Sequence, residues 1–192
     1  NHGLSKFLST VLFKIISKTE ALFIRRNHKF KNFYIKYDLS EFKLKIIRVT
    51  PKISKNGYIY RYQSDDLDKI KSQNLNLLVR GGSGILKGNI LKVCPNGVLS
   101  FHHADNRKNR GGPPGFWEVF FKEPRTGFVI QRLKEELDGG DVLYRGYVPT
   151  SWMYSLNLIK LYEISNQFFN FVIEDITSLS PKLEVEYKIP YS

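Results

Sequence analysis

Cysteine is nearly absent from this sequence, and long uncharged apolar stretches are absent altogether. The single cysteine, Cys94, excludes a disulfide within the chain and fits a protein of the reducing cytoplasm, where we expect an unreactive thiol. No stretch is long and apolar enough to predict a membrane span. The lysine-punctuated N-terminus lacks the small-residue cleavage site of a signal peptide. These absences predict a soluble protein of the cytoplasm.

Acidic residues are scarce relative to basic ones. Asp and Glu total 18 against 30 Lys and Arg, which gives a net charge of +12. Such a surface attracts the phosphates of nucleotides, nucleic acids or lipids, but it also serves solubility, and charge alone does not decide between these roles. The basic residues are scattered and form no single tract, which disfavours a nucleic-acid-binding arm. A nucleic-acid-binding protein is therefore a hypothesis that rests on charge alone, and it predicts binding that weakens steeply with salt.

Internal repeats, low-complexity segments and linkers are also lacking, so we expect a single domain over residues 1–192. Apolar spacing and turn residues predict alternating helices and strands, with Ser64 and Ser151 as helix N-caps. The predicted helices are 4–25, 64–72, 116–121 and 151–175, and the predicted strands are 43–49, 75–80, 97–102, 127–133, 142–148 and 183–189. This alternation indicates an α/β sheet that is at least partly parallel, with the first helix packed on it.

A histidine pair follows one of these strands directly. The strand at 97–102 ends in His102, and His103 comes next. Ligands in open α/β sheets bind beyond the carboxyl ends of strands, and a histidine there can carry a proton near neutral pH. A lone histidine is more often structural, so it is weak evidence by itself. The loop at 104–115 strengthens the case, because it is too polar for a core element and too rich in glycine and proline for a helix.

A second candidate lies in the acidic segment 135–141, which also follows a strand. Its Asp138 would orient an imidazole if the two loops met. The sequence does not show that they meet. On residue types alone, a plain acidic turn is slightly favoured.

Two ordered segments decide between these interpretations. The first reads SFHHADNRKNRGGPP from Ser100, and the second reads TGFVIQRLKEELDGGDVL from Thr126. Together they resemble the signature of the folate-dependent formyltransferases, which include methionyl-tRNA formyltransferases, glycinamide ribonucleotide transformylases and amino-sugar N-formyltransferases. In that family a strand ending in Asn-x-His precedes a Ser-Leu-Leu-Pro-type loop, Arg-Gly and Pro, and later Thr-Gly-x-Thr and Leu-Asp-x-Gly. The resemblance covers about residues 74–148.

The resemblance implies a Rossmann-like formyltransferase fold, with a mostly parallel sheet flanked by helices. No apolar strand precedes the helix at 4–25, so either the N-terminus is rebuilt or the family's first strand is missing. If it is missing, we expect an open sheet edge in its place and a shallow cleft. The implied reaction transfers a formyl group from 10-formyltetrahydrofolate to an amine, which requires donors to an oxyanion and proton carriers. His102, Asp138 and Ser100 would be the catalytic residues, with His102 and Asp138 within direct or one-water hydrogen-bond reach.

The resemblance also assigns binding residues and partners. The folate-binding set is Ala104, Asp105, Asn106, Arg107, Gly139 and Gly140, and the acceptor-binding set is His103, Arg110 and Gly111. We expect the charged part of the loop, 105–107, to line the same cleft as His102. The implied acceptor is a small molecule, an amino sugar that is nucleotide-linked or otherwise phosphate-bearing. No metal is expected, because no further Cys or His completes a site beside the two histidines. The helix at 151–175 could form a homodimer face as well as part of the core.

Two departures from the family pattern bear on function. Ser100 stands where the family has asparagine, and a hydroxyl is shorter than an amide and rotates freely. Residues 104–107 place charged side chains where the family loop is apolar and would lie beside folate. The alternative function is therefore a formyltransferase-like binding module with weakened catalysis.

Overall fold

The computed structural model describes residues 2–27, 29–82, 84–108, 112–136 and 139–178. Its helices are α1 (His2–Arg25), α2 (Ser64–Lys71), α3 (Phe116–Phe120) and α4 (Tyr154–Ile176), with 3-10 helices at Lys31–Tyr34 (η1), Leu39–Phe42 (η2) and Asn89–Lys92 (η3). Its strands are β1 (Lys52–Ile53), β2 (Ile59–Arg61), β3 (Leu78–Arg80), β4 (Ile85–Leu86), β5 (Val98–His102), β6 (Arg125–Arg132) and β7 (Asp141–Pro149).

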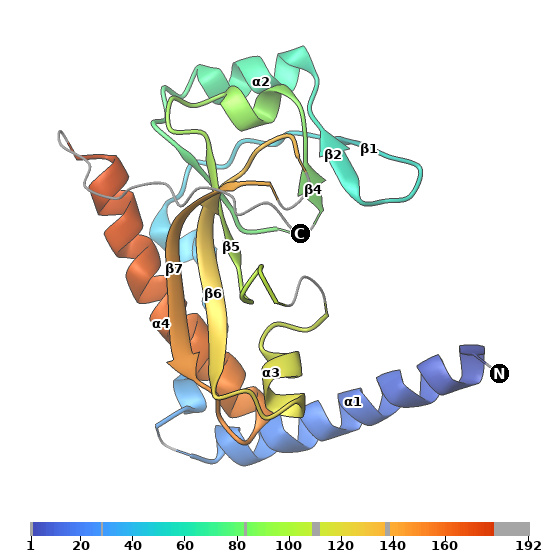
Figure 1. The fold of residues 1–192 in the computed structure, drawn as a ribbon. Helices are drawn as coiled ribbons and strands as arrows, with labels where there is room; N and C mark the ends of the chain where they lie inside the picture. Colours follow the sequence, from blue (N-terminus) through green and yellow to red (C-terminus); the bar gives the residue numbers. More distant parts are fainter. Residues whose placement is uncertain (1, 28, 83, 109–111, 137–138, 179–192) are drawn as a thin grey trace.

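The strands form two sheets, a three-stranded one of order β1-β2-β4 and a four-stranded one of order β3-β5-β6-β7 (Figure 1). In the larger sheet β3 runs parallel to β5, whereas the β5–β6 and β6–β7 pairs are antiparallel. The α/β class is confirmed, but the sheet is mixed and not mostly parallel. The reason is the short connection from β6 to β7, which turns the chain straight back, since only a longer crossover returns a strand in the parallel direction.

Strand β3 is an edge of the four-stranded sheet. Within the described residues it pairs only with β5, and its Val79 is 48% exposed. Whether this is the edge where the family's first strand would lie stays a prediction. Helix α1 does not cover it, because α1 packs against α4 instead (Figure 1).

One face of the four-stranded sheet packs against α4 (Figure 1). Side chains alternate along a strand, so Leu99 of β5 and both Phe128 and Ile130 of β6 point to this face. All three are fully buried and form the main core with residues of α4 such as Leu161. Gly146 of β7 makes room for the Phe128 ring, since a Cβ there would lie 2.2 Å from its Cζ atom.

Strand β7 contains one residue more than β6 opposite it. Ile130 pairs with Tyr144 and Gln131 pairs with Val142, so Leu143 is the extra residue. Such a β-bulge turns two successive side chains toward one face. Leu143 and Tyr144 both pack in the core on the α4 side. Val142 therefore shares the opposite face with Gln131.

That opposite face carries the polar residues of interest. At the start of β5 it is covered, because Val98 packs with Leu67 of α2 and with two residues of η3. Further along, His102 and Ser100 lie on this face by alternation, and Gln131 joins them because it pairs directly with Ser100. The sheet thus brings these three side chains to one surface.

Helix α1 forms where the sequence predicts it but has a different partner. Ile24 is buried against Ile159 of α4, and the Phe13 ring contacts the Phe116 and Tyr154 rings. The prediction that it packs on the sheet is wrong, because α4 covers that face of the sheet. Much of α1 extends away from the rest of the chain (Figure 1), and Leu12 is among its exposed apolar residues. None of the described helices is long and apolar enough to cross a membrane.

The predicted strand at 43–49 does not form. Lys43 has a left-handed backbone (φ 47°), and Leu44 and Ile46 are exposed. The segment alternates in hydropathy, but no strand pairs with it within the described residues, and alternation alone cannot hold a strand. The strand predicted at 183–189 lies outside the described residues.

The two predicted N-caps are also wrong. Gln63 and Met153 occupy the N-cap positions of α2 and α4, and neither side chain caps its helix. Ser64 is the first residue of α2. Ser151 lies ahead of α4, where its backbone N–H donates to the side chain of the buried Asn157.

Cys94 is buried, in agreement with the sequence. Burial raises the pKa of its thiol. Because the thiolate is the reactive form, this environment fits the expected unreactive thiol.

Candidate functional site

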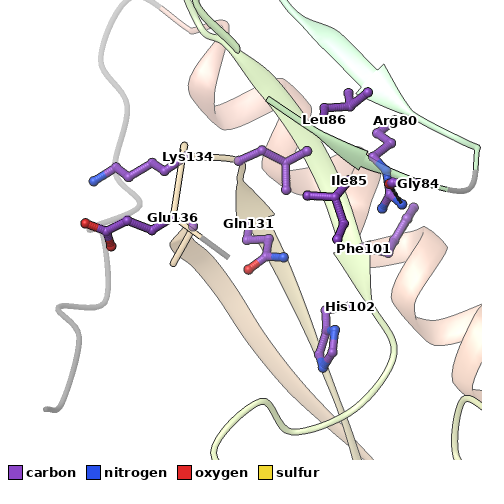
Figure 2. Close-up of a pocket in the computed structure, with 11 residues that line it drawn as sticks. Arg80, Gly84, Ile85, Leu86, Phe101, His102, Gln131, Lys134 and Glu136 are labelled. Atoms are coloured by element: carbon purple, nitrogen blue, oxygen red, sulfur yellow. Dashed lines mark hydrogen bonds between the residues drawn. The ribbon is translucent and has the colours of Figure 1, made fainter. Parts of the chain in front are cut away.

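A pocket of about 180 Å³ lies between β4 and the β5–β6 pair, on the sheet face opposite α4 (Figure 2). Ile85 and Leu86 form an apolar wall, and His102 and Gln131 supply polar groups from the sheet. Lys134 and Glu136 lie at the rim, where Figure 2 shows their charged ends pointing outward. The polar floor and apolar wall are typical of a small-molecule site, while the volume is below the usual range for a whole ligand. The pocket therefore accommodates the reacting end of a substrate.

His102 is the last residue of β5 and lines this pocket. Its Nε2 atom is buried and has no hydrogen-bond partner in the described part of the chain. Buried polar atoms are nearly always paired, so an orphaned one at a pocket wall indicates a group kept for a ligand. Depending on the tautomer, Nε2 can donate a hydrogen bond or accept a proton.

Ser100 lies deeper on the same strand and is 1% exposed. Its hydroxyl accepts a hydrogen bond from Arg80 Nη1 at 3.2 Å and donates to the backbone oxygen of Phe101 at 3.1 Å. The hydroxyl is thus occupied by protein groups. This arrangement does not support the catalytic role that the resemblance assigns to Ser100.

Arg80 ends β3 and lines the pocket, although the sequence analysis did not single it out. It also donates to the backbone oxygen of Gly84, and its buried Nε atom has no partner in the described residues. Burial lowers the pKa of its guanidinium. The sequence feature that could have identified Arg80 is its place at the end of a short apolar strand. A basic residue there lies at the carboxyl end of the strand, where ligands bind in α/β sheets.

Asp138 lies outside the described residues, so its distance from His102 stays a prediction. The flanking residues are placed: Glu136 and Gly140 both line the pocket, and Gly139 is buried. A Cβ on Gly140 would lie 2.7 Å from the backbone oxygen of Arg132, so glycine permits this close approach. The two ends of this loop therefore meet the His102 pocket.

The charged residues of the 104–107 loop lie elsewhere. Asp105 and Arg107 line a second cleft of about 320 Å³, which shares no residue with the His102 pocket. Ala104 is half-buried and Asn106 accepts a hydrogen bond from Arg145 Nη1 at 2.9 Å. The prediction that 105–107 line the cleft of His102 is wrong, because β7 holds the loop in place. Arg110 and Gly111 lie outside the described residues.

Asp105 is the centre of a buried ionic cluster. Its carboxylate accepts hydrogen bonds from Arg145 Nη1 at 2.8 Å, from the Tyr147 hydroxyl at 2.9 Å and from Arg107 Nε at 3.1 Å. Burial by itself raises the pKa of Asp105, but the bonds from Arg107 and Tyr147 outweigh it and hold that pKa below its usual value. Gly127 fits against this residue, since a Cβ there would lie 2.8 Å from the Asp105 Cβ. The cluster fixes the loop against β6 and β7.

His103 points to the other face of the sheet. Its ring stacks on Phe101 with centroids 5.0 Å apart, meets the Tyr162 ring edge-on at 4.4 Å, and places Nε2 3.1 Å from Ser165 Oγ. Burial and the neighbouring His102 lower the pKa of His103 to about 4. Packed under α4, it does not line the pocket, which does not support an acceptor-binding role.

We expect His103 to make stability depend on pH. Its folded-state pKa of about 4 lies below the ordinary 6.5, so the unfolded chain binds this proton more tightly. The contribution is therefore fully present above 6.5 and falls by about 3 kcal/mol as the pH drops to about 4. Urea unfolding of the wild type and of His103→Phe across this window should give a shallower pH dependence for the variant. Equal slopes would contradict the prediction.

No group of three or more His, Cys, Asp or Glu side chains that could hold a metal ion occurs among the described residues. Apart from Lys134 and Glu136 at the rim, the polar side chains that line the His102 pocket are those of His, Gln and Arg, all of which carry nitrogen groups. Such groups suit an oxygen atom or an anion.

Parts of this sequence are similar to known formyltransferases. No family model matches the chain. The chain is 32% identical over 85 residues to a methionyl-tRNA formyltransferase of Halalkalibacterium halodurans, covering 44% of this chain and 27% of that protein. It is 30% identical over 69 residues to that of Solibacter usitatus, covering 36% and 22%. The chain thus matches about a quarter of the length of these curated relatives.

Comparison with solved structures shows the fold. Phosphoribosylglycinamide formyltransferase from Bacillus halodurans superposes with a TM-score of 0.54 at 16% identity, covering 66% of this chain and 64% of that one. The enzyme of that name from Campylobacter jejuni gives 0.51 at 19% identity, covering 58% and 60%. The resemblance to the formyltransferases is confirmed, and the Rossmann-like formyltransferase fold with it.

Proposed function

We propose that this chain, which has a formyltransferase fold, transfers a formyl group from 10-formyltetrahydrofolate to the primary amine of a small acceptor. One observation carries the proposal: His102, whose buried Nε2 has no hydrogen-bond partner among the described residues, lines a pocket at the end of β5 in that fold. The sequence similarity to formyltransferases supports the same reaction class. Because the matched part is about a quarter of those relatives, the activity of the whole chain is the proposal to be tested.

The pocket residues fit the reacting end of such a co-substrate. The formyl donor supplies an electrophilic carbonyl, whose oxygen gains negative charge during transfer. His102 Nε2 is placed to donate to that oxygen in one tautomer and to take a proton from the attacking amine in the other. The apolar wall of Ile85 and Leu86 excludes water and strengthens these interactions.

The acceptor we propose is an amino sugar or a related phosphate-bearing amine. Arg80 in the pocket places positive charge where a phosphate would approach, whereas Lys134 at the rim is paired with Asp141. The net charge of +12 draws anions toward the chain generally. The solved relatives are named for phosphoribosylglycinamide, which is itself a phosphate-bearing acceptor.

A mass-spectrometric assay tests the function. The chain is incubated with 10-formyltetrahydrofolate and a panel of amino-sugar nucleotides and sugar-phosphate amines, and each acceptor is examined for the mass of one added formyl group. Formylation of any amine that is lost in His102→Ala supports the proposal. Folded protein that formylates no amine contradicts it. Calorimetric binding of 5-formyltetrahydrofolate without turnover would favour the weakened binding module instead, which the occupied hydroxyl of Ser100 supports.

A further inference from the structure

Gln131 is the most unusual polar residue of the pocket that the sequence did not single out. It lies on β6, is 9% exposed and lines the pocket with His102. Strand pairing and the pocket lining place its carboxamide on the Ser100 face of the sheet, at the wall of this pocket. Gln131 and His102 are therefore two polar side chains at the wall of one pocket.

The sheet fixes where Gln131 points. In the antiparallel β5–β6 pair it stands directly opposite Ser100, so the two side chains share a face. Figure 2 shows the Gln131 and His102 side chains on the same side of the two strands. The extra residue of the bulge lies in β7, opposite the Ile130–Gln131 step of β6.

The Ser100 hydroxyl does not supply the hydrogen-bond donor that the resemblance implies at its position. The resemblance places a carboxamide donor at position 100, but Ser100 is turned to Arg80 and to the backbone of Phe101. Gln131 carries the missing chemical group one strand away, and its side chain is one methylene longer than that of asparagine. That length compensates for the displacement from β5 to β6.

We propose that Gln131 is a catalytic residue whose carboxamide N–H donates to the formyl oxygen beside His102. The inference rests on the proposed function and deepens it. The amine lone pair forms the new C–N bond while the carbonyl π pair moves to oxygen. The pair then returns as the bond from carbon to the folate nitrogen breaks, and the proton lost by the amine ends on that nitrogen. Gln131 exchanges no proton or electron; it stabilises the oxygen while it is charged.

Three variants test the role. Gln131→Leu removes the donor at similar size, Gln131→Glu replaces the donor with an acceptor, and Gln167→Leu makes a matched change at an exposed position of α4. Removing one oxyanion donor lowers kcat by about 100-fold or more, so both Gln131 variants should lose that much while KM changes by less than about threefold. Gln167→Leu should keep the wild-type kcat.

The outcomes separate this inference from the function itself. Calorimetry with 5-formyltetrahydrofolate should give similar affinities for wild type and Gln131→Leu, which shows that the pocket is intact when kcat is low. If the wild type formylates an amine and both Gln131 variants keep its kcat, the role of Gln131 is overturned and the proposed function stands. If the wild type formylates no amine, the proposed function fails and this role fails with it.

Discussion

Replacing His102 with alanine is expected to lower kcat/KM for formyl transfer by about 10²–10⁴-fold, the usual contribution of a positioned acid–base group. Stability should fall by no more than about 1 kcal/mol, because the Nε2 atom that is lost makes no hydrogen bond in the described structure. Thermal unfolding and steady-state kinetics on the same preparation measure the two effects separately. The combination of a large kinetic loss and a small stability loss identifies a functional group.

His102→Gln is the matched variant. A carboxamide can still donate a hydrogen bond but cannot carry a proton near neutral pH. We therefore expect an activity between those of the wild type and His102→Ala. Activity of His102→Ala equal to that of the wild type would show that the pocket is not the reaction site.

Replacing Asp105 with alanine is expected to destabilise the fold by about 3–5 kcal/mol, because it leaves the largely buried Arg145 guanidinium without its carboxylate. The loss should show as a lower urea midpoint at neutral pH. Glu123→Ala removes a carboxylate from the more exposed ion pair with Lys108, and it should cost less than about 1 kcal/mol. Equal losses in the two variants would contradict the assignment of Asp105 as the buried centre of the cluster.

Acid should reduce the difference between Asp105→Asn and the wild type. The folded-state pKa of Asp105 is held below its ordinary value of 3.8. Its ionised form therefore contributes stability that is present above 3.8 and is lost as the pH falls through the lowered pKa. Urea midpoints of the two proteins should converge at the acid end of the titration. A constant difference at every pH would indicate that the charge of Asp105 does not matter.

Local sequence pattern was sufficient for one part of the site. The apolar run that ends at His102, and the polar loop after it, are both local features, and β5 ends where they predict. The prediction of a strand at 43–49 was wrong because alternating hydropathy shows only that a segment can form a strand. The strand also needs a partner from elsewhere in the chain. Helix α1 was found for the same local reasons as β5, but its packing partner was not.

The remaining site residues depend on pairing that no local pattern reveals. Gln131 reads as one polar position in an apolar strand, and only the register with Ser100 turns it toward His102. Asp105 reads as a loop charge near a ligand, but Arg145 and Tyr147 reach it from β7, 40 and 42 residues further along the chain. The burial of Gln131 and Asp105 depends on contacts between distant parts of the chain, so only the structure shows what these residues contact.

The extra residue in β7 has a consequence for how the chain can change during evolution. On the sheet face opposite α4, Val142 lies before the bulge, and Arg145 and Tyr147 lie after it. The alternation along β7 is therefore out of phase between the end beside Gln131 and the end beside Asp105, whose rows include His102, and Leu143 makes the correction. Point substitutions can alter either end independently. A deletion of Leu143 would turn the side chains at one end of β7 to the other face of the sheet. We therefore expect this strand to accept substitutions more readily than insertions or deletions.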